Sequence, residues 1–208
     1  GKIDRTERDK VQLGVVEGMA GPTTELYLTD DFIDELHKIS EDVEGEGATY
    51  SAVGINQCLI FIYITKADYD WTVTQANAAM ITPYLDSSME RLGMYTNFDS
   101  MTSMADYDYI TEATGSTTLA YNGNLNRSRA CYVMDVSRYM QSLVNYVRTL
   151  AKDADGKYTF DEGADGYVPR TIQIGPEAVS PYTFKRSLLQ GMEGGENAAP
   201  IAIELTYT

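Results

Sequence analysis

Apolar and polar residues alternate with a period of two along much of the chain, and this alternation predicts β-strands. The clearest case is the C-terminal segment 201–207, where Ile201, Ile203, Leu205 and Tyr207 alternate with small or polar residues. Shorter strand patterns occupy residues 11–19, 23–28, 89–95, 117–121, 129–136, 170–174 and 182–189. Such a series of short strands predicts a mostly β fold, namely an antiparallel, jelly-roll-like β-sandwich.

The most apolar run of the sequence lies within residues 53–64, from Cys58 to Ile64. A run without alternation is typical of a strand that is covered on both faces, so we expect a central strand here. Between the strand patterns 11–19 and 23–28, the Gly21-Pro22 step predicts a turn or bulge in a bent edge strand.

Two short amphipathic helices are expected to pack on the sheets, near residues 30–40 and 138–151. Their apolar positions recur at helical spacing: Phe32, Ile33, Leu36 and Ile39 in the first, and Met140, Leu143, Val144 and Val147 in the second. Thr29 or Asp30 is expected to cap the first helix at its N-terminus, and Ser137 the second.

The 208 residues, 43% of them hydrophobic, are enough for one domain with a sizeable core. We expect an N-terminal tail over residues 1–10 and a single sandwich domain over residues 11–208. Loop insertions are expected near residues 66–88, 97–116 and 153–166, where the periodicity is lost. Binding groups tend to lie in such loops, because a rigid sheet positions them.

Sixteen basic residues stand against thirty-one acidic ones, which gives a formal net charge of -15. This charge repels phosphate backbones and anionic lipid surfaces, so nucleic acid is not an expected partner. A polysaccharide or a surface protein is compatible with it. We interpret most of the carboxylates as a solvated exterior, with a specific cation-binding role as the alternative.

The best candidate ligand platform is the loop segment Asp68, Tyr69, Asp70 and Trp71. Flat aromatic rings match the apolar faces of sugars and present a polar tip. Two other interpretations stay open. Trp71 can instead pack over the edge of the sandwich as a core residue, and Asp68 and Asp70 can be exposed loop charge or the acid pair of a glycosidase.

Asp153, Asp155 and Asp161 form the candidate metal site, because oxygen-rich loops of this kind bind calcium. The glycine of the Asp153-Ala154-Asp155-Gly156 run stands at the fourth position instead of the sixth, so the EF-hand pattern fails. The competing interpretation is an ordinary Asp-Gly turn. Calcium is the one cofactor that the sequence leaves open.

Neither cysteine nor the single histidine indicates catalysis. Cys58 and Cys131 lie in apolar strand patterns, so we expect buried thiols. A disulfide between them is the alternative if the two strands are neighbours, and it would contribute about 4 kcal/mol. His37 is expected on a solvated helix surface, and a triad would depend on it alone. We therefore expect a protein that is not an enzyme.

Several passages carry a family resemblance. Residues 129–144 (RACYVMDVSRYMQSLV) resemble the strand-to-helix passage of DNRLRE-type sandwich modules, which occur in secreted bacterial proteins and carbohydrate-active systems. Residues 182–191 (YTFKRSLLQG) and 200–208 (PIAIELTYT) resemble the end of a Bacteroidota lipoprotein family of unknown function, and residues 18–28 and 54–61 fit that family's order.

The resemblance implies an exported protein that is displayed on the cell surface at the outer membrane. Contact with the membrane would be made only through a lipid anchor upstream of Gly1. It implies no catalytic residues. The leading hypothesis is a non-catalytic surface lipoprotein module that binds a glycan or acts as a scaffold. The alternatives are a fimbrial or adhesin subunit, paired through an open edge at residues 200–208, and a glycoside hydrolase with two facing carboxylates.

Overall fold

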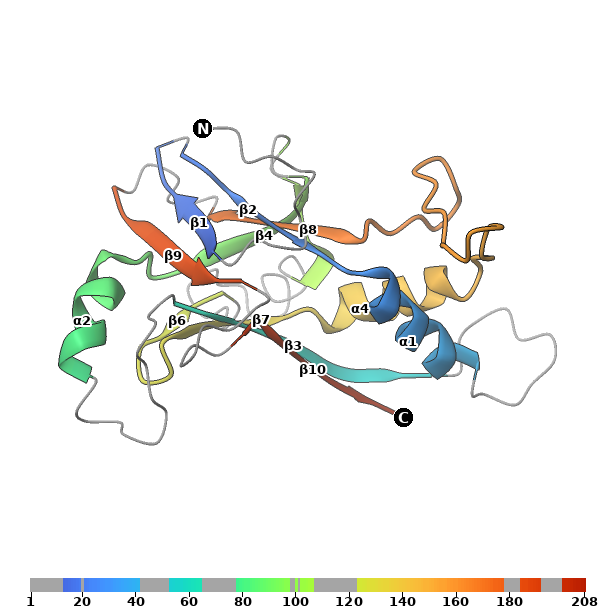
Figure 1. Cartoon of the computed structure of the whole chain (residues 1–208), viewed down its shortest axis with the longest axis horizontal. Coiled ribbons are helices and arrows are strands. Elements are labelled where there is room, and N and C mark those ends of the chain that lie inside the picture. Colours follow the sequence, from blue (N-terminus) through green and yellow to red (C-terminus); the bar gives the residue numbers. More distant parts are fainter. Residues whose placement is uncertain are drawn as a thin grey trace.

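The computed structural model describes residues 13–19, 21–41, 53–64, 78–97, 100, 102–106, 123–177, 184–191 and 200–208. Within these residues the chain is mostly β, with antiparallel sheets and short helices (Figure 1). The expected mostly β fold of antiparallel sheets with short packing helices is therefore confirmed.

One four-stranded sheet is built around the most apolar run of the sequence. Its order is β10-β3-β7-β6. The strands are β10 (Ala202–Tyr207), β3 (Ile55–Tyr63), β7 (Cys131–Asp135) and β6 (Leu125–Asn126). Ile60 and Ile62 of β3 are fully buried and lie opposite Met134 and Tyr132 of β7. The predictions of a central strand and of a C-terminal strand that is locked into a sheet are both confirmed.

The second four-stranded sheet has the order β2-β8-β4-β5 and lies above the first in Figure 1. Its strands are β2 (Thr24–Tyr27), β8 (Thr171–Pro176), β4 (Leu92–Asn97) and β5 (Thr102–Ser103). Ile172 and Ile174 of β8 belong to the same hydrophobic cluster as Ile60 and Ile62 of the first sheet. The two sheets therefore share one core.

A two-stranded ribbon of β1 (Leu13–Glu17) and β9 (Arg186–Gln190) lies beside the sheets. An isolated bridge between Ile64 and Leu189 joins it to the end of β3. The prediction of one bent edge strand over residues 11–28 is wrong, because β1 and β2 pair in different sheets. The turn between them, in which the Glu17 N–H donates to the Pro22 carbonyl oxygen at 3.0 Å, redirects the chain.

Helices α1 (Asp30–Glu41) and α4 (Ser137–Val147) form where the sequence predicts them, and Figure 1 places them at the same end of the molecule. Thr29 is the expected cap of α1, since its hydroxyl accepts the Phe32 N–H at 3.3 Å. Helix α4 buries its apolar stripe in the shared core: Met140, Leu143, Val144 and Val147 are fully buried. Polar residues of α4 are left facing away from the core.

Two details of α4 correct the prediction. The helix ends at Val147 and not at residue 151. The N–H groups of Thr149 and Leu150 bond three residues back, to the carbonyls of Tyr146 and Val147, so the helical pattern of bonds four residues back stops there. Ser137 is also not the N-cap. Its hydroxyl bonds to the Asp135 carboxylate and accepts the Cys58 N–H at 2.9 Å, so it ties the helix to β3.

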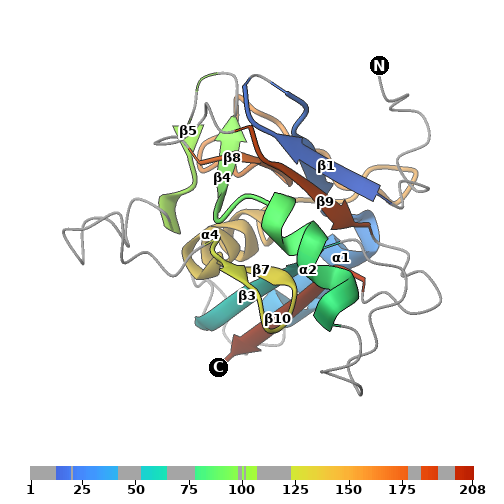
Figure 2. The same ribbon diagram turned by 90° about the vertical axis from the view of Figure 1, so that its left-hand side faces the viewer.

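Helix α2 (Ala78–Ser87) lies inside the predicted insertion 66–88, at the opposite end of the molecule from α1 in Figure 1 and at the end that faces the viewer in Figure 2. Its sequence gives a weak helical signal because Pro83 stands inside it. Residues 153–166 form successive turns, and that they are an insertion stays a prediction. The insertion 97–116 is described only in part, and residues 1–10 and 117–121 lie outside the described residues.

Candidate functional site

The polar side of α4 forms one wall of an open groove. Ser142, Asn145 and Thr149 follow one another at spacings of three and four residues, so they share one face of the helix and are exposed there. The opposite face is held in the core by Leu143, Val144 and Val147. The wall is therefore rigid, since burial of the apolar stripe fixes the rotation of the helix about its axis.

The other wall is the end of the 153–170 excursion, which two tyrosine hydroxyls of α4 hold in place. The Tyr139 hydroxyl donates to the Pro169 carbonyl oxygen at 2.7 Å. The Tyr146 hydroxyl accepts the Asp161 N–H at 3.2 Å and lies 3.4 Å from the Asp161 carbonyl oxygen. The rings of Phe160 and Tyr167 meet the Tyr146 ring edge to face. A loop that is polar in sequence is thus packed around an aromatic cluster.

Arg170 anchors the end of the excursion to the segment between β2 and α1. Its guanidinium donates two hydrogen bonds to the Leu28 carbonyl oxygen, at 2.9 and 2.6 Å, and pairs with Asp30 at 2.8 Å. It also lies over the rings of Tyr27 and Phe160, 4.4 and 5.0 Å from their centroids. Because both ends of the loop are fixed, the groove is preformed.

The groove has a volume of about 350 Å3, which is within the range of small-ligand sites. Its lining residues are Ser142, Asn145, Tyr146, Thr149, Asp165, Gly166, Tyr167 and Val168. Among the described residues, no hydrogen-bond partner is found for the hydroxyls of Ser142 and Tyr167 or the carboxylate of Asp165. Asn145 uses only its carbonyl oxygen, which accepts from Gln141 at 3.2 Å. Donors and acceptors therefore remain for a ligand.

Charge in the groove is limited to one sign. Asp165 is the charged residue of the described lining, and the lining contains no lysine or arginine. Burial and the nearby charge of Glu162 raise the pKa of Tyr167, so its hydroxyl stays protonated and can donate. The groove therefore offers neutral donors, an amide, a carboxylate and an aromatic ring, and it offers an anionic ligand no counter-charge.

The N-terminal end of the same helix has a different character. The two carboxylate oxygens of Asp106 accept the N–H groups of Arg138 and Tyr139, at 2.6 and 2.9 Å. Burial raises the pKa of Asp106, while these two N–H groups act in the opposite direction. The adjacent cavity, which Asp106 and Asp135 also line, measures about 10 Å3, roughly the space of one water molecule. These carboxylates cap a helix and have no room to bind a substrate.

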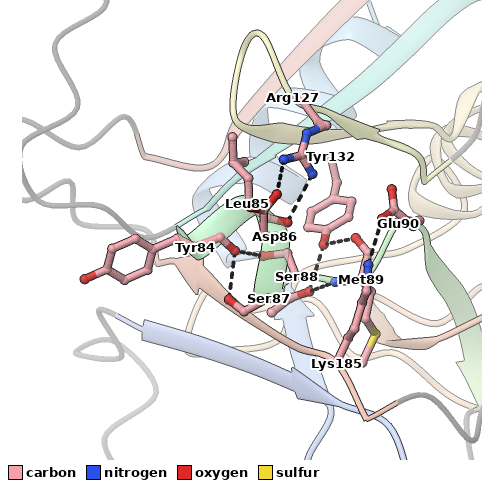
Figure 3. Close-up of polar contacts among 11 residues, drawn as sticks. Tyr84, Leu85, Asp86, Ser87, Ser88, Met89, Glu90, Arg127, Tyr132 and Lys185 are labelled. Atoms are coloured by element: carbon pink, nitrogen blue, oxygen red, sulfur yellow. Dashed lines mark hydrogen bonds and ion pairs between the residues drawn. The ribbon is translucent and has the colours of Figure 1, made fainter. Parts of the chain in front are cut away.

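A second polar cluster lies at the end of α2 (Figure 3). The Tyr132 hydroxyl donates to the Met89 carbonyl oxygen at 2.7 Å and lies 2.8 Å from the Ser187 hydroxyl, which accepts the Met89 N–H at 3.0 Å. Tyr132 and Ser187 are fully buried, and burial raises the pKa of Tyr132. Tyr132 therefore cannot act as a base for a serine at neutral pH, and the cluster joins β7, β9 and the segment between α2 and β4 structurally.

Ion pairs at the surface add to the contacts at the end of α2. Arg127 pairs with Asp86 and donates to the Leu85 carbonyl oxygen, so a residue from the β6–β7 turn caps the C-terminal end of α2 (Figure 3). Lys185 pairs with Glu90 at 2.7 Å. The Arg127 contacts hold the C-terminal end of α2, a helix whose own sequence pattern is weak.

The structure describes one of the two candidate sites that the sequence predicts. Asp68, Tyr69, Asp70 and Trp71 lie outside the described residues, so the platform stays a prediction. Asp153 accepts the N–H groups of Asp155 and Lys157, at 2.9 Å each, and Asp161 accepts the Gly163 N–H at 2.9 Å. No three metal-ligating side chains come together within the described ranges. Asp153 and Asp161 thus serve turns, and calcium binding stays a prediction.

Both thiols are buried and free, as expected. Their strands, β3 and β7, are neighbours. Cys131 of β7 lies opposite Tyr63 of β3, however, and Cys58 lies five residues before Tyr63 in the same strand. Five residues also place the two side chains on opposite faces of the sheet, so a disulfide cannot form. Burial raises the pKa of Cys58 to about 12 and that of Cys131 to about 11. His37 is only partly solvated, since its ring stacks on Tyr158 with centroids 5.4 Å apart.

The groove residues Ser142, Asn145, Asp165 and Tyr167 were not singled out from the sequence. Polar positions opposite an apolar stripe are usual for any surface helix, so α4 gives no signal of its own. The detectable signal lay in the excursion, where Tyr158, Phe160 and Tyr167 interrupt an otherwise polar loop. Three aromatic residues in such a loop indicate packing against the body of the protein.

Comparison of the chain with family models, with curated proteins and with solved structures found no match. The resemblance to a Bacteroidota lipoprotein family therefore stays an expectation. Within the part of the chain that the structure describes, no helix combines the length and the apolar character needed to span a membrane.

Proposed function

We propose that this protein is a non-catalytic glycan-binding module of a cell-surface lipoprotein and that it binds a neutral oligosaccharide in the groove between α4 and residues 165–168. The observation that carries the proposal is a set of polar groups, beside an aromatic ring, that have no hydrogen-bond partner among the described residues. Ser142, Asn145 and Asp165 have free hydrogen-bonding capacity, and Tyr167 adds its ring and hydroxyl. Sugar hydroxyls match the polar groups, and the apolar face of a pyranose matches the ring.

The charge of the groove supports a neutral ligand. A uronate or a sulfated sugar would bring its negative charge beside Asp165, and no cation of the described lining would compensate it. The net charge of -15 adds long-range repulsion of anions.

The carboxylates that line the groove and the small cavity also argue against catalysis. Glycoside hydrolysis needs two carboxyl groups across the bond that is cleaved, about 5–9.5 Å apart. Asp165 is the one carboxylate in the described lining. Asp106 and Asp135 lie at a cavity of about 10 Å3, which is too small to admit a sugar.

The test is a binding screen against neutral and anionic polysaccharides, followed by calorimetry on each hit. Tyr167→Ala should weaken binding of a neutral glycan at least about tenfold, or 1.4 kcal/mol, and Tyr167→Phe should weaken it less, because the ring remains. The matched control is Tyr84→Ala, which removes the ring of an exposed tyrosine outside the groove; in Figure 3 this ring points away from the neighbouring contacts. All three variants should remain folded by circular dichroism.

Trp71→Ala, measured in parallel, separates the groove from the platform that the sequence predicts. If binding depends on Trp71 and not on Tyr167, the ligand binds at residues 68–71 and the groove is not the site. If no neutral glycan binds at all, the proposed function is wrong.

A further inference from the structure

Strand β10 forms the most open sheet edge among the described residues. It contains six residues and, among the strands that the structure describes, pairs only with β3, and Figure 1 draws it at the lower border of the molecule. The other described sheet edges are shorter, with five residues each in β1 and β9, four in β2 and two each in β5 and β6. An open strand edge exposes backbone N–H and C=O groups, which can pair with another strand.

Only the two ends of β10 carry the features that usually block such pairing. Pro200 precedes the strand, and the register with β3 shifts between Thr206 and Tyr207. Thr208 and Gly54 exchange two backbone hydrogen bonds, at 2.9 and 3.0 Å. The backbone polar groups of successive residues in an antiparallel strand point alternately to its two sides, so those of Tyr207 point to the open side. Between these ends, Glu204 is the only charge of the strand.

The side chains of β10 make the edge complementary to itself. We propose that β10 pairs with β10 of a second copy, antiparallel and centred on Ile203, to give a closed two-fold dimer. In this register Ile203 faces Ile203, and Ile201 faces Leu205. These three side chains are only partly buried and pack against the core, so the second copy would cover their open sides.

The opposite face of the strand fits the same register. Ala202 faces Glu204 of the second copy, so no like charges meet. A register centred on Glu204 would place two carboxylates opposite each other, and an odd shift would place core-facing residues against outward-facing ones. The dimer is closed because each copy contributes the same edge, which leaves no further strand to extend it.

The general charge of the chain acts against association. Each copy carries a formal charge of -15, so the dimer should strengthen as salt screens the repulsion. Pairing through one six-residue strand is a small interface, and we expect a weak dimer that is seen at high protein concentration.

The experiment is sedimentation equilibrium of the full chain up to about 1 mM protein, at low salt and at about 0.5 M salt. Ala202→Lys creates two ion pairs with Glu204 across the dimer and should lower the dissociation constant. Ala202→Glu creates two like-charge pairs and should raise it, so that the two variants differ about tenfold or more. Ala154→Lys and Ala154→Glu, at an exposed turn, are matched controls for net charge and should differ much less.

Cross-linking tests the register independently. Ile203→Cys brings two introduced thiols together at the two-fold axis and should give a disulfide dimer under mild oxidation. Tyr207→Cys places an exposed thiol on the same strand away from its copy and should not. A chain that stays monomeric for the wild type and Ala202→Lys in high salt overturns the proposal. It is equally overturned by fibres or by a dimer that is indifferent to Ala202 and Ile203.

Discussion

The two ends of helix α4 are both rich in polar groups, yet they differ in how these groups are used. At the N-terminal end, Asp106 accepts two backbone N–H groups, and the nearby cavity is about 10 Å3. Toward the C-terminal end, Ser142 and Asn145 face an open groove of about 350 Å3 with hydrogen-bonding capacity left over. A polar cluster indicates a binding site only when its groups remain unpaired and a ligand has room to reach them.

The comparison predicts that substitutions at the N-terminal end reduce stability, whereas substitutions at the groove reduce binding. The largest effect is expected for Gly123→Ala, beside the small cavity. Gly123 has a φ of +77°, and an added Cβ would overlap the Leu92 carbonyl oxygen. Gly123 also bonds to Leu92 and Val133, so it cannot move away freely. We expect a loss of about 3–4 kcal/mol in the free energy of unfolding, measured by urea denaturation. A loss below 1 kcal/mol would mean that the backbone of Gly123 and Leu92 can shift to make room for the methyl group.

Asp106→Ala is expected to have the next largest effect. It leaves the N–H groups of Arg138 and Tyr139 without an acceptor in a buried site, which should cost about 2–3 kcal/mol of unfolding free energy. Glycan binding per folded molecule should be unchanged, and calorimetry on the folded variant checks this. If binding were lost in a folded Asp106→Ala variant, the two ends of α4 would be coupled and the contrast between them would fail.

The pH dependence of stability should also report on Asp106. Burial raises its pKa above the ordinary value of 3.8, so the folded chain binds a proton there more readily than the unfolded chain. Its stabilising contribution is fully present below pH 3.8 and declines as pH rises through the folded pKa. The wild type should therefore gain stability relative to Asp106→Asn on going from pH 7 to pH 4. Denaturation of both proteins at the two pH values measures this, and an advantage that shrinks toward pH 4 would contradict it.

The smallest stability effect is expected at the groove. Ser142→Ala removes an exposed hydroxyl that has no partner among the described residues, so the free energy of unfolding should change by less than about 0.5 kcal/mol. Affinity for a neutral glycan should nevertheless fall several-fold in calorimetry. A variant that binds as the wild type does would remove Ser142 from the site and narrow the groove to Asn145, Asp165 and Tyr167.

Sequence patterns predicted the elements whose signal is local. The apolar run at β3, the alternation in β10 and the stripes of α1 and α4 each follow from burial of one strand or helix face, and each is confirmed. Helix α2 was missed because its own signal is weak and its C-terminal end is held by a distant residue, Arg127, which donates to the carbonyl of Leu85. The cap of α4 was misassigned for the same reason, since Asp106 is separated from it by thirty-two residues.

The candidate site was harder to predict than the fold. Pairing of a polar group is a property of three-dimensional contacts. Nothing in the sequence distinguishes Asp161, whose carboxylate serves a turn, from Asp165, whose carboxylate has no partner in the part of the chain that the structure describes. The aromatic residues of the excursion indicated that this loop packs against the protein. They did not indicate that α4 forms the other wall of the groove.

The separation of the two cysteines has a practical consequence. Because Cys58 and Cys131 lie on opposite faces of adjacent strands and are not cross-linked, the stability of the described fold should not depend on the redox potential of its surroundings. Both thiols are also shielded and protonated at neutral pH, so a thiol reagent can modify them only when the sheet opens. The rate of modification therefore measures how often β3 and β7 come apart, and the native chain already contains the two probes.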